Sequence, residues 1–195
     1  MINPEYKLLE GFDGQFREYE ICSVRQVDAL PIMRWRNAQI HALRQSAPLT
    51  ETGQLSYFHE IVFPSFSQDH PPLIILSFLR EKKLIGYGGI VHLDWETKRG
   101  EVSFLLDPER TKDKQAYGLE LGTFLTLLKR LAFRKLSLNR LTTEAYDTRP
   151  WHIKAIEANG FRLEGILRQH IWKDGHFADA HLHACLREEF EKNEF

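Results

Sequence analysis

Three histidines near the C-terminal end of the sequence are the first side chains whose spacing could serve chemistry. His181 and His183 are two residues apart, and side chains alternate along a β-strand, so both would lie on one face of it. No cysteine or carboxylate completes a zinc ligand set at a recognised spacing with these residues or with His170. We therefore expect no metal site.

The two cysteines offer a second kind of chemistry, the attack of a thiolate on a substrate. Cys22 and Cys185 lie far apart in the sequence, and no His-paired cysteine motif is visible around either of them. Two cysteines do not form a disulfide framework, and the N-terminus lacks the basic and apolar segments of a signal peptide. These features predict a cytoplasmic protein without a cysteine nucleophile.

A basic loop before a long apolar stripe is a candidate anion site. The loop spans residues 110–118 and contains Lys112 and Lys114, and the apolar stripe that follows predicts a helix over Leu119 to Leu136. Free backbone N–H groups at the start of a helix bind phosphate oxygens, and the two lysines would add positive charge. The alternative is an ordinary charged loop that caps a core helix.

The composition bounds the class of protein. The chain has 195 residues, of which 43% are hydrophobic and 27% are charged, as in a soluble globular protein. We expect one domain over residues 1–195, with a core from about 19 to 188. The formal net charge of -1 gives no electrostatic reason to expect nucleic acid or a membrane as partner.

Apolar periodicity and turn residues predict the elements that would position these groups. Asp28 and Thr50 are expected to cap two helices, Pro64 to Pro72 to form a loop, and Asp174-Gly175 to form a hairpin turn. Strands are expected over Tyr19–Arg25, Leu73–Leu79, Leu84–Leu93, Glu101–Leu106, Leu141–Tyr146, Phe161–Trp172 and Phe177–Leu186, and a further helix over Ile153–Asn159. This order predicts an α/β fold, a mixed and mostly antiparallel sheet with helices on both faces.

Five segments in this order resemble those of a known enzyme family. They are Trp35–Asn37, Leu84–Gly89, Gly100–Glu109, Glu157–Gly165 and Lys173–Asp179. Together they are similar to segments of the GNAT superfamily of N-acetyltransferases, over roughly Ile21 to Leu186. The last two resemble the branch that includes ribosomal-protein N-terminal acetyltransferases and bacterial amino-sugar N-acetyltransferases.

The resemblance implies the GNAT acyl-CoA N-acyltransferase fold, with acetyl-CoA as co-substrate and a primary amine that attacks it directly. A backbone N–H between Ser103 and Leu106 would stabilise the oxyanion, and the loop before the long helix would hold the pyrophosphate. The residues expected to contact the cofactor are Phe104, Leu105, Leu106, Lys112, Lys114, Gln115, Ala116, Tyr117, Gly118 and Arg149.

Two segments, the pyrophosphate turn and the later helix with its entrance, depart from the family pattern. Lys114 stands where the first glycine of the pyrophosphate turn is usual, and Ala116 occupies the second small position. Arg149 replaces the usual asparagine before the later helix, and it could reach a phosphate. Ile156 occupies the position of the tyrosine that protonates the leaving thiolate in some relatives, and it cannot donate a proton.

The resemblance also places the amine and its base. An alkylamine has a pKa near ~10 and must lose a proton before it attacks, so a general base is required. Glu101 is the first candidate for the base and Asp147 the second, and His92 could relay a proton. Alternatively, Glu101 is a strand residue that faces solvent, and Asp147 only caps a turn or helix. The acceptor would lie against Trp35, Arg36, Asn37, Tyr57 and Tyr87.

The resemblance leaves the acceptor open. We expect a small molecule such as an amino sugar, with a monomer or homodimer as the assembly. The alternatives are the N-terminus of a protein, or a non-catalytic homologue that only binds an acyl-CoA.

Overall fold

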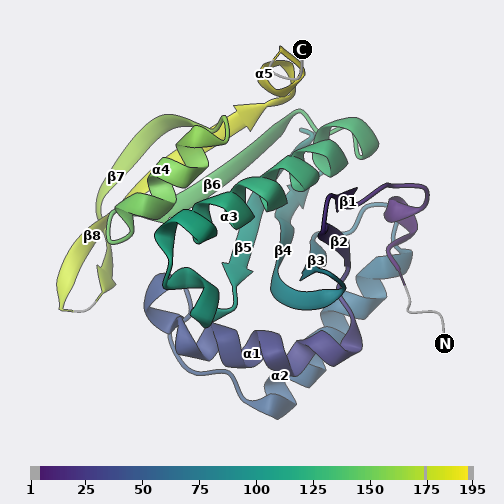
Figure 1. Cartoon of the computed structure of the whole chain (residues 1–195), viewed down its shortest axis with the longest axis horizontal. Helices are drawn as coiled ribbons and strands as arrows, with labels where there is room; N and C mark the ends of the chain where they lie inside the picture. The colour runs from purple at the N-terminus through teal and green to yellow at the C-terminus, as the bar shows by residue number, and fades with distance from the viewer. Residues whose placement is uncertain (1–4, 174, 193–195) are drawn as a thin grey trace.

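A computed structural model describes residues 5–173 and 175–192, which form one eight-stranded sheet with helices on both faces (Figure 1). The strands are β1 (Gln15–Phe16), β2 (Tyr19–Ser23), β3 (Ile74–Arg80), β4 (Lys83–Asp94), β5 (Arg99–Leu106), β6 (Arg140–Tyr146), β7 (Arg162–Lys173) and β8 (His176–Leu186). Their order in the sheet is β1-β2-β3-β4-β5-β6-β8-β7, and the β5–β6 pair alone among these neighbours is parallel. The predicted mixed, mostly antiparallel sheet is therefore confirmed.

The helices divide between the two faces of the sheet. They are α1 (Ala29–Ala38), α2 (Glu51–Tyr57), α3 (Lys114–Lys129), α4 (Pro150–Ala158) and α5 (Arg187–Lys192). On β3, Phe78 packs against Phe124 of α3 with ring centroids 5.4 Å apart, while the neighbouring Ser77 donates a hydrogen bond to Asp28 beside α1. Because adjacent side chains on a strand point to opposite faces, α3 covers one face and α1 the other.

The core lies mainly between the sheet and α3. The stripe predicted for this helix is buried, with Leu121, Phe124 and Leu125 each at most 1% exposed. The start of the helix was predicted wrongly, at Leu119, because that prediction followed the apolar residues alone. The helix begins at Lys114, since the carboxylate of Asp113 caps it by accepting hydrogen bonds from the N–H groups of Gln115 and Ala116.

Two other local predictions need correction. Asp28 precedes α1 but its side chain makes no cap bond; the carboxylate instead binds Arg25 and Ser77. The predicted loop from Pro64 starts inside a 3-10 turn, Phe63–Ser67, whose buried Phe66 packs against Phe63. The Thr50 cap is confirmed, because its hydroxyl accepts from the N–H of Gly53 at 3.1 Å.

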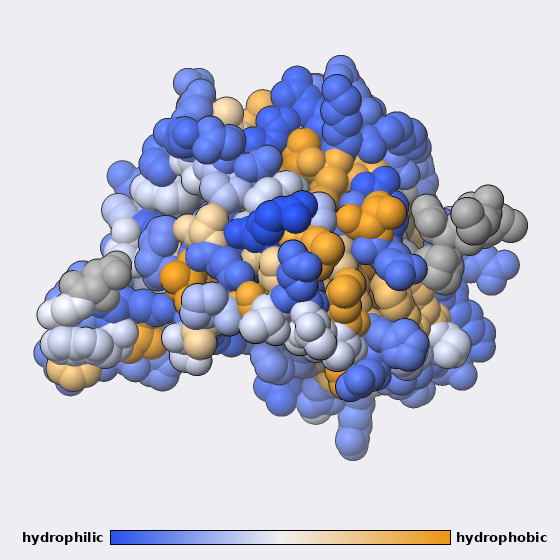
Figure 2. Space-filling model, turned by 90° about the horizontal axis from the view of Figure 1, so that it is seen from below, coloured by the Kyte–Doolittle hydropathy of each residue, from blue (hydrophilic) through white to orange (hydrophobic). Residues whose placement is uncertain are grey.

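The β7–β8 hairpin forms an arm at the edge of the sheet. Figure 2 shows it projecting from a face that is mostly hydrophilic, and it exposes Trp172 and Phe177 by 61% and 56%. Asp174 of the predicted turn lies outside the described residues. Within the described ranges, no helix combines the length and apolarity needed to cross a membrane.

Candidate active site

The parallel strands β5 and β6 separate from each other part of the way along the sheet. They pair through Arg99–Arg140, Gly100–Leu141 and Glu101–Thr142. Beyond these pairs β5 remains bonded to β4, and β6 to β8, but the two strands no longer pair with each other. A gap therefore opens in the middle of the sheet after Glu101.

Backbone groups of β5 face this gap. The N–H of Asp107 donates to the carbonyl of Ile85 on the β4 side, whereas the carbonyl of Leu106 points the other way and accepts from Gln39 at 2.8 Å. Since these groups alternate in direction along a strand, the N–H groups of Val102 and Phe104 point away from β4; that of Val102 is used in the last bond of the β5–β6 pairing, at Thr142, and that of Phe104 points into the gap. A backbone N–H group held in this position can stabilise a developing oxyanion.

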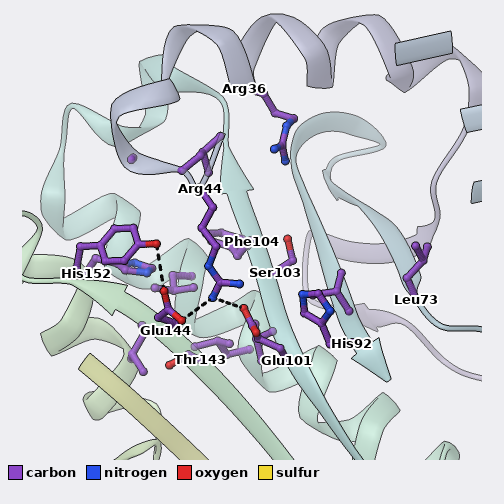
Figure 3. A pocket seen from close by; sticks show the side chains of 18 of the residues that line it. Arg36, Arg44, Leu73, His92, Glu101, Ser103, Phe104, Thr143, Glu144 and His152 are labelled. Carbon is purple, nitrogen blue, oxygen red and sulfur yellow. Dashed lines mark hydrogen bonds and ion pairs between the residues drawn. The ribbon is translucent and has the colours of Figure 1, made fainter. Parts of the chain in front are cut away.

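A cavity of about 520 Å³ passes through the gap and joins the two faces of the sheet (Figure 3). Its walls on the α3 and α4 face are Phe104, Leu121, Leu125, Thr143, His152 and Ile156. Its walls on the α1 and α2 face include Arg36, Arg44, Tyr57, Glu101, Ser103, Glu144 and Tyr146. Two reactants can thus approach from opposite faces and meet at the gap.

An ion-pair cluster spans the gap where the strands separate. Arg44 lies 2.7 Å from Glu101 on β5 and 3.1 Å from Glu144 on β6, and the hydroxyl of Tyr146 donates to Glu144 at 3.1 Å (Figure 3). Glu101 therefore lies in the cavity, as predicted for the base. Arg44 and Glu144 were not predicted, because their contacts join segments far apart in the sequence.

The other two candidates for proton transfer lie in different places. His92 lines the same cavity at an irregularity of β4 and has a left-handed backbone, with a φ of 50°. Asp147 is exposed, and it is not among the cavity-lining residues. The structure therefore brings Glu101 and His92 to one cavity and leaves Asp147 outside it.

The predicted pyrophosphate loop is already bonded within the chain. The Asp113 carboxylate occupies two of the N–H groups that open α3, those of Gln115 and Ala116. The ammonium of Lys114 donates to the carbonyl of Thr111 and lies 4.0 Å from the centre of the Trp151 ring. These N–H groups can bind an anion, but a phosphate must displace Asp113 to use them.

Three more predicted cofactor residues differ in their surroundings. Lys112 pairs with Glu109 in solvent, Leu105 is buried in its pairing with Tyr87, and Gly118 has open space where a side chain would begin. None of the three lines the cavity.

Arg149 provides a partly buried positive charge at the cavity wall. Its Nη2 donates to the carbonyl of Ala42 at 3.5 Å, and its Nε is buried without a hydrogen-bond partner among the described residues. Burial lowers the pKa of this guanidinium. A buried donor of this kind suits an anionic group, and its contact with acetyl-CoA stays a prediction.

A buried tyrosine–histidine pair joins α3 to α4, and sequence reasoning missed its histidine. The hydroxyl of Tyr117 and Nδ1 of His152 are 2.8 Å apart, and His152 lines the cavity. Burial lowers the pKa of His152 from 6.5 to about 3, and it raises the pKa of Tyr117. Both groups are therefore neutral near pH 7, and Tyr117 faces the helix interface rather than a phosphate.

The His152 pKa predicts how stability depends on pH. The unfolded chain binds a proton at this residue near pH 6.5 and the native chain only near pH 3, so stability is full above 6.5 and declines as the pH falls toward 3. His152→Gln should therefore lose less stability than the wild type as the pH falls from 7.5 to 5, as measured by urea titrations at each pH. Equal slopes for wild type and His152→Gln would contradict the prediction.

Some of the residues predicted to contact the acceptor line the cavity, and the others support the structure around it. Arg36 and Tyr57 line the cavity, and the buried Tyr87 accepts a hydrogen bond from Arg36 at 2.6 Å. Asn37 accepts from the N–H of Leu49 and so supports the loop between α1 and α2. Trp35 packs against the core.

The histidines of β8 do not form a metal site in the structure. The rings of His181 and His183 stack at 6.3 Å, and Nε2 of His183 lies 3.3 Å from Glu157. Among the described residues, no three His, Cys, Asp or Glu side chains are grouped to hold a metal ion.

A sheet that opens around a cavity reached from both faces, with an oriented N–H donor and carboxylates at the opening, is suited to the transfer of an acyl group between two reactants. The family model described as an acetyltransferase (GNAT) domain matches residues 21–182. The chain therefore belongs to the GNAT acetyltransferases, and it is an acetyl-CoA-dependent enzyme of that family.

Solved structures share this fold. A spermidine N-acetyltransferase from Vibrio cholerae in complex with CoA and spermine has a TM-score of 0.77 at 14% identity, covering 90% of this chain and 99% of that one. A chimera of the spermidine N-acetyltransferase SpeG from Vibrio cholerae has a TM-score of 0.76 at 15% identity, with coverages of 90% and 99%. No curated protein matches the chain. At these identities the structures establish the fold alone.

Proposed function

We propose that this enzyme transfers the acetyl group of acetyl-CoA to the primary amine of a small molecule. The cavity that crosses the sheet carries this proposal, because it lets the two reactants approach from opposite faces. The similar Vibrio cholerae enzymes, which act on spermidine, support a small amine as acceptor. The amino-sugar branch and a monomeric or homodimeric assembly remain predictions; one similar structure, at 15% identity, is described as dodecameric.

The donor would bind on the α3 and α4 face. Acetyl-CoA supplies an acetyl group activated as a thioester. The N–H group of Phe104 would stabilise the oxyanion, Arg149 would hold an anionic part, and the N–H groups that open α3 would hold another after Asp113 moves aside. Ile156 lines the cavity and cannot donate a proton, so the thiolate would leave without an acid at that position.

The acceptor would bind on the α1 and α2 face, beside Glu101. Glu101, directly or through a water molecule, would take the proton that an ammonium must lose before the nitrogen attacks. Neither cysteine lines the cavity, and burial raises the pKa of Cys22 to about 11. These positions support direct attack by the amine without an acetyl-enzyme.

Acetyl-CoA should raise the melting temperature of the protein. Ligand at ~100 times its dissociation constant adds about 2.7 kcal/mol, or roughly 5–10 °C for a chain of this size. Asp113→Asn should enlarge the shift at subsaturating ligand because it removes the negative charge from the start of α3, while Arg149→Gln should reduce it. A thermal-shift titration measures all three, and no shift at saturation would refute the proposal.

Turnover distinguishes the possible acceptors. Thiol release from acetyl-CoA with small primary amines would support the proposal. Release only with peptides that have a free N-terminus would indicate protein acetylation, and binding without release would indicate a non-catalytic homologue.

A further inference from the structure

We propose that the acceptor amine carries an anionic group and that Arg36 binds it. The substrate class is then a small amine with a phosphate or carboxylate, such as a phosphorylated amino sugar, rather than a polyamine. This inference rests on the proposed function and adds the chemistry by which the acceptor is recognised.

Arg36 is held in place by neutral acceptors alone. Its Nη1 donates to the hydroxyl of Tyr87 at 2.6 Å, and its Nε donates to the side-chain carbonyl of Gln45 at 3.0 Å. Among the described residues no hydrogen-bond partner of Nη2 is found, and no carboxylate lies within ion-pair distance of Arg36. The guanidinium is thus fixed while part of its donor capacity remains for a ligand.

Arg44 shows the opposite arrangement in the same cavity. It lies between Glu101 and Glu144, which neutralise it. Arg36, in contrast, is half-buried and has no carboxylate paired with it among the described residues. An anionic group on the substrate would supply the missing charge, whereas a polyamine would add a second cation beside it.

Arg36 also lies where two cavities meet. It lines the cavity through the sheet and a neighbouring cavity of about 330 Å³, together with Tyr57, Val91 and Ser103. An acceptor that fills this junction can place its anionic group on Arg36 while its amine reaches toward Glu101 (Figure 3). The guanidinium is suited to this because its planar donors match phosphate and carboxylate oxygens.

Matched pairs of amines test the inference. Thiol release would be measured with a hexosamine and with its phosphate monoester, and with spermidine as the cationic competitor. We expect kcat/KM to be roughly 10- to 100-fold higher for the phosphate ester, mainly through KM, as for a hydrogen bond between charged groups. Arg36→Gln should remove this preference, because kcat/KM should fall by about that factor for the phosphate ester and by much less for the unphosphorylated sugar.

Arg34→Gln is the matched control, since Arg34 is an exposed arginine of the same helix, and it should keep the preference. Equal use of both sugars by the wild type, a preference for spermidine, or equal loss on both sugars in Arg36→Gln would overturn the inference while leaving amine acetylation intact. If no amine releases thiol, the proposed function fails. Arg36 can then still be tested by the rise in melting temperature that the phosphate ester causes with CoA present. Loss of this rise in Arg36→Gln would support the anion site, and an unchanged rise would refute it.

Discussion

Glu101→Gln is expected to lower kcat at neutral pH by about 10²–10⁴-fold, which is the usual contribution of a general base. The amide keeps the shape of the carboxylate and its contact with Arg44, but it cannot accept the proton of the ammonium. The loss should shrink as the pH rises toward the amine pKa near ~10, because free amine then forms without help. Acetyl-CoA affinity should change little, since Glu101 lies on the acceptor side of the gap.

Glu144→Gln is the matched control for this experiment. It removes the other carboxylate that binds Arg44 at 3.1 Å, and so it disturbs the same cluster from the opposite strand. Measurements of kcat against pH for the three proteins, with the folded fraction from circular dichroism, decide the role. Parallel pH profiles for wild type and Glu101→Gln would exclude Glu101 as the base and turn attention to His92.

Asp28→Ala is expected to destabilise the fold by about 3–5 kcal/mol, because it removes one partner from a buried ion pair. Asp28 is 2% exposed and binds Nε and Nη2 of Arg25 at 2.7 Å each, and it accepts from Ser77 of β3 at 2.5 Å. The melting temperature should fall by roughly 6–20 °C for a chain of this size.

Thr50→Ala provides the comparison for Asp28. It removes a helix cap that is exposed to solvent, and such a change typically costs about 1 kcal/mol. Thermal denaturation followed by circular dichroism compares the two variants. A loss for Asp28→Ala no larger than that for Thr50→Ala would show that the Arg25–Asp28–Ser77 cluster adds little to stability.

Local sequence patterns predicted most strands of the fold to within a few residues. The strand expected over Leu73–Leu79 is Ile74–Arg80, and that over Leu141–Tyr146 is Arg140–Tyr146. The short strand Gln15–Phe16 was missed, because two residues carry no period and it depends on pairing with Tyr19–Glu20. The side chain of Asp28 was misassigned for a similar reason: its partner Ser77 lies 49 residues away.

Residues of the candidate site could be predicted where their role follows from a position in a strand. They could not be predicted where their role follows from contacts between distant segments of the chain. Glu101 and Phe104 were found because they belong to β5, which resembles a family segment. Arg44 was missed because only folding brings it to Glu101, 57 residues away. Neutral His152 has no sequence signal of its own, since its environment comes from Tyr117 on another helix.

The three residue pairs that join β5 to β6, here called the seam, also affect the order in which the chain folds. Strands β3 to β5 and the β7–β8 hairpin join neighbours in sequence, so their loops close at little entropic cost. The seam requires a crossover that includes α3, and such non-local parallel pairing forms slowly. We therefore expect two half-sheets to form first and to dock afterwards, so that the cavity for acetyl transfer arises in the last step of folding.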